Sequence, residues 1–414
     1  MKLTFQIAKT HLLAKPKQTL VAMLGVTFGI GMFIAMVSMM TGLNDMTENL
    51  AMTSSADIRI YNDITLDRPS ILEEVNPSGI NVTHHTKPKN ETPKIRNAFK
   101  IAELIRQNPL VRGASPQLTS QVFYNYGPIQ LNGTISGVDI LEEDNLFDLK
   151  NKMKEGRIEN LIVSQDGIIM GKGLAKKLNA KTGDRVVITT PQGYTMSLKI
   201  VGLFQMGMGA IDNVKSYANI STVQRILQRD KSYITDINIK LHDFHFAKAV
   251  APEFQKSFGY KSEDWESANA TMLLGVIIRN ILTYSVSITL LIVAGFGIYN
   301  ILNMTIMNKM KDIAILKAMG FSGRDVKQIF MIQSIVIGLL GSMMGLVIGF
   351  LLSYLISRAP FDGGDIISIN HIPVNFKLKY YVIGIVFGVV TTAIAGYMPS
   401  RKAAKLDPIE ILRG

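Results

Sequence analysis

The chain has 414 residues, of which 47% are hydrophobic and 18% are charged, and its formal net charge at pH 7 is +12. It contains no cysteine, which excludes disulfide bonds, thiolate metal ligands and cysteine nucleophiles. A positive charge of this size suits a partner such as nucleic acid or an anionic membrane, so the position of the basic residues decides between these classes.

Four long, predominantly apolar stretches contain no Asp, Glu, Lys or Arg: Gln18–Asn44, Asn280–Asn308, Gln328–Ser357 and Tyr380–Ser400. A helix of roughly 20 apolar residues crosses the ~30 Å hydrocarbon core of a bilayer, so each stretch is long enough. One such run could be a buried helix of a soluble protein, but four runs favour a membrane protein with four transmembrane α-helices. The first stretch is too long for the apolar part of a signal peptide, and we interpret it as a retained anchor.

Most of the excess positive charge lies in short segments that flank these stretches. Residues 1–17, 309–327 and 401–414 together hold 13 basic and 4 acidic residues, whereas residues 358–379 hold three and two. Because cytoplasmic flanks are rich in Lys and Arg, both termini are predicted to be cytoplasmic. Residues 45–279 are nearly balanced, with 28 basic and 26 acidic residues, so the net charge reflects membrane topology and we expect no nucleic-acid partner.

This topology divides the chain into nine segments. They are a cytoplasmic interfacial helix at 1–17, helix 1 at 18–44, a periplasmic domain at 45–279, helix 2 at 280–308, a cytoplasmic coupling helix at 309–327, helix 3 at 328–357, a short periplasmic loop at 358–379, helix 4 at 380–400 and a cytoplasmic tail at 401–414. The interfacial helix is predicted from the amphipathic pattern of residues Leu3 to Leu13, which precede Pro16; a frayed tail is the alternative.

The large extracytoplasmic segment, inserted between helices 1 and 2, is predicted to be an α+β domain of two lobes. Alternating residues predict strands at Ala56–Tyr61, Val111–Val138 (with turns at Asn125–Pro128 and Asn132–Gly133), Ile168–Met170, Arg185–Thr190, Ser197–Phe204 and Asp236–Leu241. Helical spacing predicts helices at Lys94–Gln107, Leu174–Leu178 and Phe246–Phe258. The proline-rich segment Ile64–Pro93 is predicted to be an extended loop or an insertion.

No catalytic motif is present in the sequence. There is no Walker A loop, no G-x-S-x-G elbow and no H-E-x-x-H pair, and Gly171–Gly173 fits a turn before a helix better than a phosphate loop. The pairs His84-His85 and His242/His245 lack carboxylate or thiolate companions at a suitable spacing, which favours solvated histidines over a metal site. We therefore predict that the chain is not an enzyme and binds no cofactor or metal of its own.

Small, polar and thioether residues recur within the predicted membrane helices. Gly341, Gly345 and Gly349 have the four-residue spacing that allows close helix packing in lipid, either within the chain or against a second copy. We identify a candidate lipid or substrate cleft between helices 1 and 2 of paired copies, although helix contacts and ordinary lipid packing also explain its residues. Its residues are Met32, Met36, Met39, Met40, Asn300 and Asn303.

The segment Asn308–Phe330 reads NKMKDIAILKAMGFSGRDVKQIF and predicts a short amphipathic helix, followed by a turn at Gly320–Gly323 that leads into helix 3. A short helix joined stiffly to two spans can convert a push from a cytosolic partner into a tilt of both, although a simple connector is the alternative. The candidate coupling residues are Lys309, Lys311, Asp312, Ile313, Leu316, Lys317 and Gly320.

Three separated motifs resemble the FtsX/MacB/LolC-type permeases of ABC transporters. They are KMKDIAILKAMGFSGRDVKQIF from Lys309, PSRKAAKLDPIEILRG from Pro399, and GIIMGKGLAKKLNAKTGDRVVIT from Gly167. Asp312 stands where the family usually has glutamate, and Ile411 replaces a common alanine. The resemblance covers essentially the whole chain. It implies a permease that works as a pair over a separate ATPase dimer, which would bind the ATP and Mg.

Two further stretches, SMMTGLNDMTENL from Ser38 and SEDWESANATMLLG from Ser262, are similar to the lipoprotein-releasing members LolC and LolE. The hairpin Val186–Lys199 lacks the longer protrusion with which LolC holds its lipoprotein carrier. The resemblance thus implies lipoprotein release from the bacterial inner membrane, with a second permease copy or paralogue and membrane lipid as partners. The alternatives are MacB-like export of antibiotic, peptide or glycolipid with an outer-membrane partner, and FtsX-like regulation of cell-wall hydrolases without transport.

Overall fold

The protein forms two compact units along the chain. A helical unit contains the described residues of Met1–Thr47, Leu274–Phe361 and Asn370–Gly414, and a sheet unit contains those of Glu48–Leu273 and Asp362–Ile369. The computed structural model describes residues 2–14, 16–64, 92–361, 364 and 371–407.

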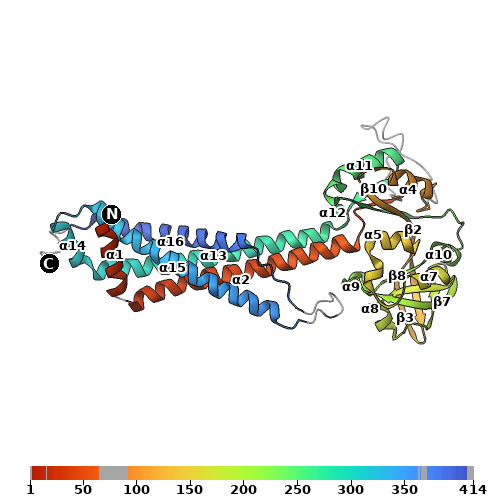
Figure 1. Ribbon diagram of the computed structural model, residues 1–414, viewed down its shortest axis with the longest axis horizontal. Helices are drawn as coiled ribbons and strands as arrows, with labels where there is room; N and C mark the ends of the chain where they lie inside the picture. The colour runs from red at the N-terminus through yellow and green to blue at the C-terminus, as the bar shows by residue number, and fades with distance from the viewer. Residues whose placement is uncertain (1, 15, 65–91, 362–363, 365–370, 408–414) are drawn as a thin grey trace, which may run out of the picture. The chain divides into compact units, whose positions relative to one another are not determined.

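Within those residues, four helices are long and apolar enough to cross a membrane: α2 (Pro16–Ser54), α13 (Ala270–Asn308), α15 (Gly323–Arg358) and α16 (Leu378–Lys405). Figure 1 shows them side by side along much of their length. The four predicted spans are therefore present as helices. Each helix is longer than the uncharged stretch that predicted it, because charged residues end a run of lipid-compatible sequence without ending a helix.

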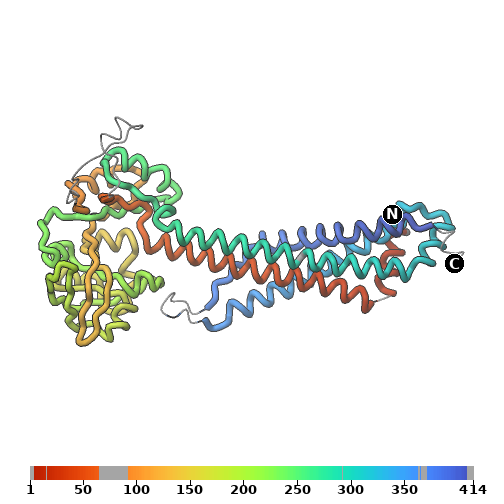
Figure 2. The backbone as a smooth tube through the Cα atoms, turned by 180° about the vertical axis from the view of Figure 1, so that it is seen from behind, coloured from red at the N-terminus to blue at the C-terminus, as the bar shows by residue number. Residues whose placement is uncertain are grey.

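Two short helices lie at one end of the helical unit, as Figures 1 and 2 show from opposite sides: α1 (Lys2–Ala14) and α14 (Met310–Ala318). α1 ends just before Pro16, as predicted. It packs on α15, where His11 lies 6.4 Å from the ring of Phe330 and its Nδ1 is 3.1 Å from Nε2 of Gln333. The expected interfacial segment is thus a helix held against the membrane helices.

The sheet unit contains ten strands in its described residues, in the order β10-β1-β9-β2-β3-β8-β5-β7-β4, with β6 paired to β2 and β7. Most neighbours are antiparallel, but β3–β8 and β5–β7 are parallel. The strands are β1 (Ile58–Tyr61), β2 (Val111–Tyr126), β3 (Ile129–Val138), β4 (Met153–Gly156), β5 (Gly167–Gly171), β6 (Arg185–Thr189), β7 (Thr195–Phe204), β8 (Lys215–Asn219), β9 (Asp236–Leu241) and β10 (Lys261–Asp264).

Helices pack on this sheet around three hydrophobic cores, one of which lies among α5, α6, α7 and β5 and contains Phe147 and Phe204. A second core lies among β2, β3, β5 to β8 and the helices α8 and α10, and it contains Leu118, Ile135 and Ile188. The third lies among β1, β9, α4 and α11, and it contains Ile60 and Trp265. The helices are α4 (Ala98–Arg106), α5 (Ile140–Phe147), α6 (Leu149–Lys152), α7 (Glu159–Val163), α8 (Lys172–Leu178), α9 (Gly209–Asp212), α10 (Ile220–Ile226), η1 (Phe244–Phe246), α11 (Ala247–Phe258) and α12 (Trp265–Ala268).

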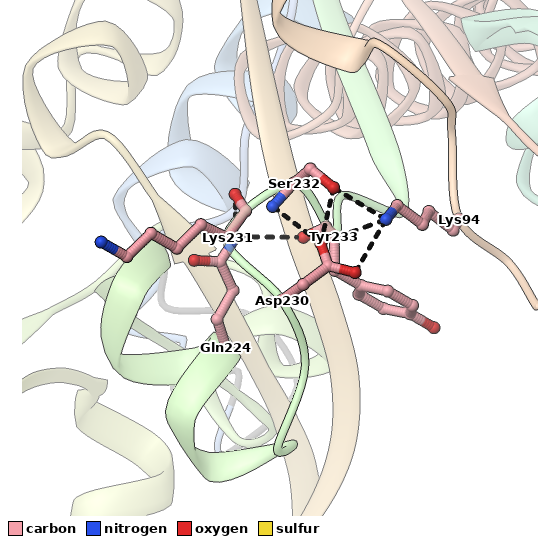
Figure 3. A network of polar contacts seen from close by, with 6 residues as sticks. All are labelled: Lys94, Gln224, Asp230, Lys231, Ser232 and Tyr233. Atoms are coloured by element: carbon pink, nitrogen blue, oxygen red, sulfur yellow. Dashed lines mark hydrogen bonds and ion pairs between the residues drawn. The ribbon is translucent and has the colours of Figure 1, made fainter.

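A polar network fixes the connection that leads from α10 to β9 (Figure 3). Asp230 accepts a hydrogen bond from the backbone N–H of Ser232 at 2.8 Å and pairs with Nζ of Lys94 at 2.9 Å. Gln224 donates to the carbonyl of Lys231 at 2.9 Å. The hydrogen bonds from Ser232 and Lys94 lower the pKa of Asp230 to about 2, because they stabilise its ionised form.

The predicted strands and helices of this unit are present within a few residues of their expected limits, with one exception. The turn predicted at Asn132–Gly133 is wrong, because both residues lie inside β3 and pair with Phe123 and Val122. Asn-Gly signals a turn when no partner strand is near, but here β2 supplies one. Glycine is required at 133 because a Cβ there would lie 2.5 Å from the carbonyl oxygen of Val214.

Several expectations fall outside the described residues. They are most of the Ile64–Pro93 insertion, with its histidine pair at 84–85, part of the loop at 358–379, and the tail from residue 408 onwards, which includes Ile411.

Candidate functional site

The predicted coupling residues form a short helix and a tight turn between α13 and α15. α14 is followed by Gly320, whose φ of +99° is a conformation that residues with a Cβ rarely adopt. Ser322 then caps α15 through a capping box with Asp325. Gly323 starts α15 directly against α16, where a Cβ would lie 2.8 Å from the carbonyl oxygen of Ala404. The turn therefore leaves little freedom between α14 and α15.

The apolar face of α14 is buried against the three membrane helices around it. Ile313 is fully buried, and Leu316 is half-buried. The cluster around Ile313 joins α13, α15 and α16 through Ile306, Val326, Phe330 and Ala403. A displacement of α14 would disturb packing on all three helices, because close-packed interiors do not deform freely.

Lys317 connects α14 to the end of α16. Its Nζ donates hydrogen bonds to the carbonyls of Ala404 at 2.8 Å and Leu406 at 2.6 Å. The last carbonyls of a helix have no partner within the helix and carry partial negative charge, so an ammonium group there is favourable. Lys317 therefore acts as a cap for α16 that is supplied by a different helix.

The other coupling residues face away from this cluster. Lys309 pairs with Asp312 at 2.6 Å, and Lys311, Asp312 and Gly320 are exposed. The helix thus has one face packed on the membrane helices and one exposed face, which carries Lys311 and Asp312 together with the apolar side chains of Ile315 and Met319.

Sequence reasoning missed the residues that receive α14. Val326 was assigned to the predicted coupling segment 309–327, Phe330 to helix 3 and Ala403 to the tail, although all three are buried beneath Ile313. The i, i+4 spacing of Val326 and Phe330 was a usable signal for a second apolar face. Which helix they face depends on contacts distant in the sequence, and no local pattern gives these.

The three spaced glycines of α15 lie against α2 of the same chain. A Cβ on Gly341, Gly345 or Gly349 would lie 2.8 or 2.9 Å from the Cβ of Val26, Ile30 or Ile34 respectively. Real Cβ atoms do not approach so closely, so larger residues would push the two helices apart.

The six residues of the predicted cleft occupy varied environments. Met32 and Asn300 are exposed, whereas Met36, Met39, Met40 and Asn303 are half-buried. α2 and α13 are joined further along by Asn44, which donates to Asn280 at 2.8 Å and accepts from Arg279 at 3.0 Å. A separate open groove of about 590 Å³ lies between α13 and α16, and its lining includes none of the six.

The sequence matches two described families. Residues 19–257 match the MacB-like periplasmic core domain, and residues 284–408 match the FtsX-like permease C-terminal domain. The first match covers more than half of the chain, and together they cover most of the sheet unit and of the four long helices, except residues 258–283.

Relatives are similar over most of the chain. The lipoprotein-releasing system transmembrane protein LolC of Xylella fastidiosa is 27% identical over 337 residues, covering 75% of this chain and 79% of the relative. LolE of the same system from Haemophilus influenzae is 21% identical over 438 residues, covering 100% and 99%. The macrolide export ATP-binding/permease protein MacB of Psychrobacter cryohalolentis is 23% identical over 441 residues, covering 99% and 59%. As its three sequence motifs predicted, the chain belongs to the family of FtsX-like ABC transporter permeases that carry a MacB-like periplasmic core domain.

Proposed function

We propose that this chain is the permease subunit of an ABC transporter that releases lipoproteins from the bacterial inner membrane. The similarity to LolC and LolE over most of the chain supports this choice among the functions of the family. The proposed transmission of ATPase motion to the membrane helices is supported by one observation, the attachment of α14 to α16 through Lys317. The chain would work with an ATPase dimer, which binds the ATP and Mg, and with a second permease copy or a paralogue.

In this proposal, both termini and α14 are cytoplasmic. The strands of the sheet unit all lie between α2 and α13 in the sequence, and this part of the chain is a periplasmic insertion between the first two spans. The excess of basic residues in the segments next to α14 and the termini supports this orientation. The hairpin between β6 and β7 turns within residues 190–194, so the proposal includes no carrier docking through a long protrusion there.

ATP-driven closure of the partner subunits would act on the segment Lys309–Gly320. The exposed face of α14 would receive the push, and its buried face would pass the displacement to α13, α15 and α16 together.

Gly320 is important for this coupling because its positive φ fixes the direction in which α15 leaves the turn. Replacing Gly320 with valine should reduce transport several-fold at unchanged membrane insertion, because a β-branched residue is strained at this φ. Unchanged transport would contradict the coupling role.

Whether the cargo is a lipoprotein can be tested by crosslinking at the residues of the predicted cleft. These residues are Met32, Met36, Met39, Met40, Asn300 and Asn303. A photo-crosslinking amino acid at Met36 or Met40 should capture the acyl chain of a lipoprotein in membranes that contain the ATPase. The matched control is Val347, an exposed position on α15. Equal capture at all three positions, or no capture at Met36 and Met40, would count against lipoprotein release by this cleft.

The similarity to MacB and the match to its core domain favour a second candidate, export of an antibiotic, peptide or glycolipid. Deletion of the gene separates the candidates. Defective lipoprotein sorting supports the first, and drug sensitivity with normal sorting supports the second. Chained cells with neither defect would indicate a regulator of cell-wall hydrolases that transports nothing.

A further inference from the structure

The groove between α13 and α16 is built from two matching stripes of side chains. On α13 the stripe is Ile288, Ile292, Gly295, Phe296 and Tyr299, and on α16 it is Phe387, Thr391, Ile394, Ala395 and Met398. Both stripes have the spacing i, i+4, i+7, i+8, i+11, which keeps each on one face of its helix. The two helices meet closely at Gly295, where a Cβ would lie 3.2 Å from Cγ2 of Thr391.

The dimensions of the groove suit one hydrocarbon chain. A stripe that spans 11 residues of helix is ~16 Å long at 1.5 Å per residue, about half of the ~30 Å hydrocarbon core of a bilayer. The groove is therefore about as long as one leaflet is thick. Its volume is about 590 Å³, and its lining is apolar except for Tyr299 and Thr391.

One end of the groove is polar and positively charged. Tyr299 lies at the last position of its stripe and accepts a hydrogen bond from Nζ of Lys402 at 3.5 Å. Arg401 and Lys402 follow Met398 by three and four residues, so both continue the stripe on α16, and both are exposed. No lining residue carries a charge. The groove thus has an apolar body and a cationic end, which complements a lipid with a negative head group.

We propose that this groove binds one anionic glycerophospholipid, with an acyl chain between α13 and α16 and the phosphate at Tyr299, Arg401 and Lys402. A zwitterionic lipid of the same chain length would fill the apolar body equally well but would gain less from the two cations. The site is separate from the predicted cleft at Met36 and Asn303. The inference requires only that α13 and α16 span a membrane, so it does not depend on which cargo the transporter carries.

The test uses the full-length chain in detergent and native mass spectrometry, with phosphatidylglycerol and phosphatidylethanolamine of identical acyl chains. We expect one retained phosphatidylglycerol per chain and weaker retention of phosphatidylethanolamine. Each cation removed, by Arg401→Gln or Lys402→Gln, should weaken phosphatidylglycerol binding about fivefold. The control Lys379→Gln removes the same charge at the other end of α16 and should leave binding unchanged.

A second pair of variants tests the apolar body. Ile292→Trp places a larger side chain in the lining and should abolish retention, whereas Val293→Trp, at an exposed neighbour outside the lining, should not. Equal retention of the two lipids, or equal effects of Lys402→Gln and Lys379→Gln, would overturn the proposal. A disulfide between two copies carrying Ile394→Cys would also overturn it, since a second chain would then cover the groove.

Discussion

Lys317 is the residue whose role depends most on a distant partner. It lies 87 and 89 residues from the two carbonyls that it caps. At the level of sequence, it is one of five basic residues in the segment 309–327, where it contributes to the prediction of topology. In the folded chain it joins two helices.

Replacing Lys317 with methionine keeps the apolar stem and removes the ammonium group. Hydrogen bonds from charged groups contribute ~1.5–3 kcal/mol when buried, and Lys317 is half-buried, so we expect a loss of about 1–2 kcal/mol of stability. The loss should appear as a lower thermal midpoint in detergent. The control Lys405→Gln removes an exposed charge from the last turn of α16. A midpoint equal to that of the control would show that the cap contributes nothing.

Glu143 on α5 is a carboxyl group inside the sheet unit, with 0% of its surface exposed. Burial raises its pKa to about 7, although Lys215 favours the charged form. Between pH 4.5 and 7 the folded chain therefore holds a proton that the unfolded chain has released. Stability must then fall as pH rises through this range, since the folded state binds more protons.

The variant Glu143→Gln carries no titrating group at this position and should lack this pH dependence. At pH 8 we expect it to be more stable than the wild type by about 3 kcal/mol, because the raised pKa of Glu143 costs ~1.36 kcal/mol of stability for each pH unit between 4.5 and about 7. Unfolding can be followed by fluorescence of Trp265, the single tryptophan. Glu103→Gln, at an exposed position, is the control. Parallel pH profiles for wild type and Glu143→Gln would refute the assignment.

At the scale of elements, the contact between α2 and α15 is set by glycines. In an isolated helix, replacing glycine with alanine stabilises the helix by about 1 kcal/mol, because alanine loses less backbone entropy when the helix forms. At Gly345 the new Cβ would lie 2.9 Å from Cβ of Ile30 and 3.0 Å from the carbonyl oxygen of Thr27. Both atoms belong to or adjoin the backbone, so the helices must separate.

We therefore expect Gly345→Ala to destabilise the chain by about 1–3 kcal/mol, the usual cost of overpacking. The matched control is Gly297→Ala on α13, where no atom lies within 4 Å of the added Cβ. This substitution should be neutral or stabilising. Thermal unfolding of the two variants in the same detergent gives the comparison, and a stabilised Gly345→Ala would show that the α2–α15 contact is looser than the distances indicate.

At the scale of the whole molecule, the proposed topology can be tested because the chain has no cysteine. A single introduced cysteine is then the only site for a thiol label. Lys256→Cys lies on α11 of the sheet unit, and Arg324→Cys lies in the first turn of α15; both positions are exposed. We expect a membrane-impermeant maleimide to label Lys256→Cys in intact spheroplasts and Arg324→Cys only after permeabilisation. Labelling of both from one side would exclude transmission across the membrane.

The sequence by itself determined the number of spans, most strands of the sheet unit and the short helix at α14. These features follow from local patterns: uninterrupted apolar runs, alternation with period two, and helical spacing. The family was also readable, because its motifs at Lys309 and Gly167 are continuous in the chain.

The tertiary structure alone decided which surfaces meet. It placed Gly345 against Ile30, Lys317 at the end of α16, and the open groove between α13 and α16. It also placed Asn132 and Gly133 inside a strand, since β2 supplies the partner that a local turn signal cannot anticipate. In each case the deciding contact joins residues far apart in the chain or on different strands, and the energy of such a contact depends on distances that no local pattern encodes.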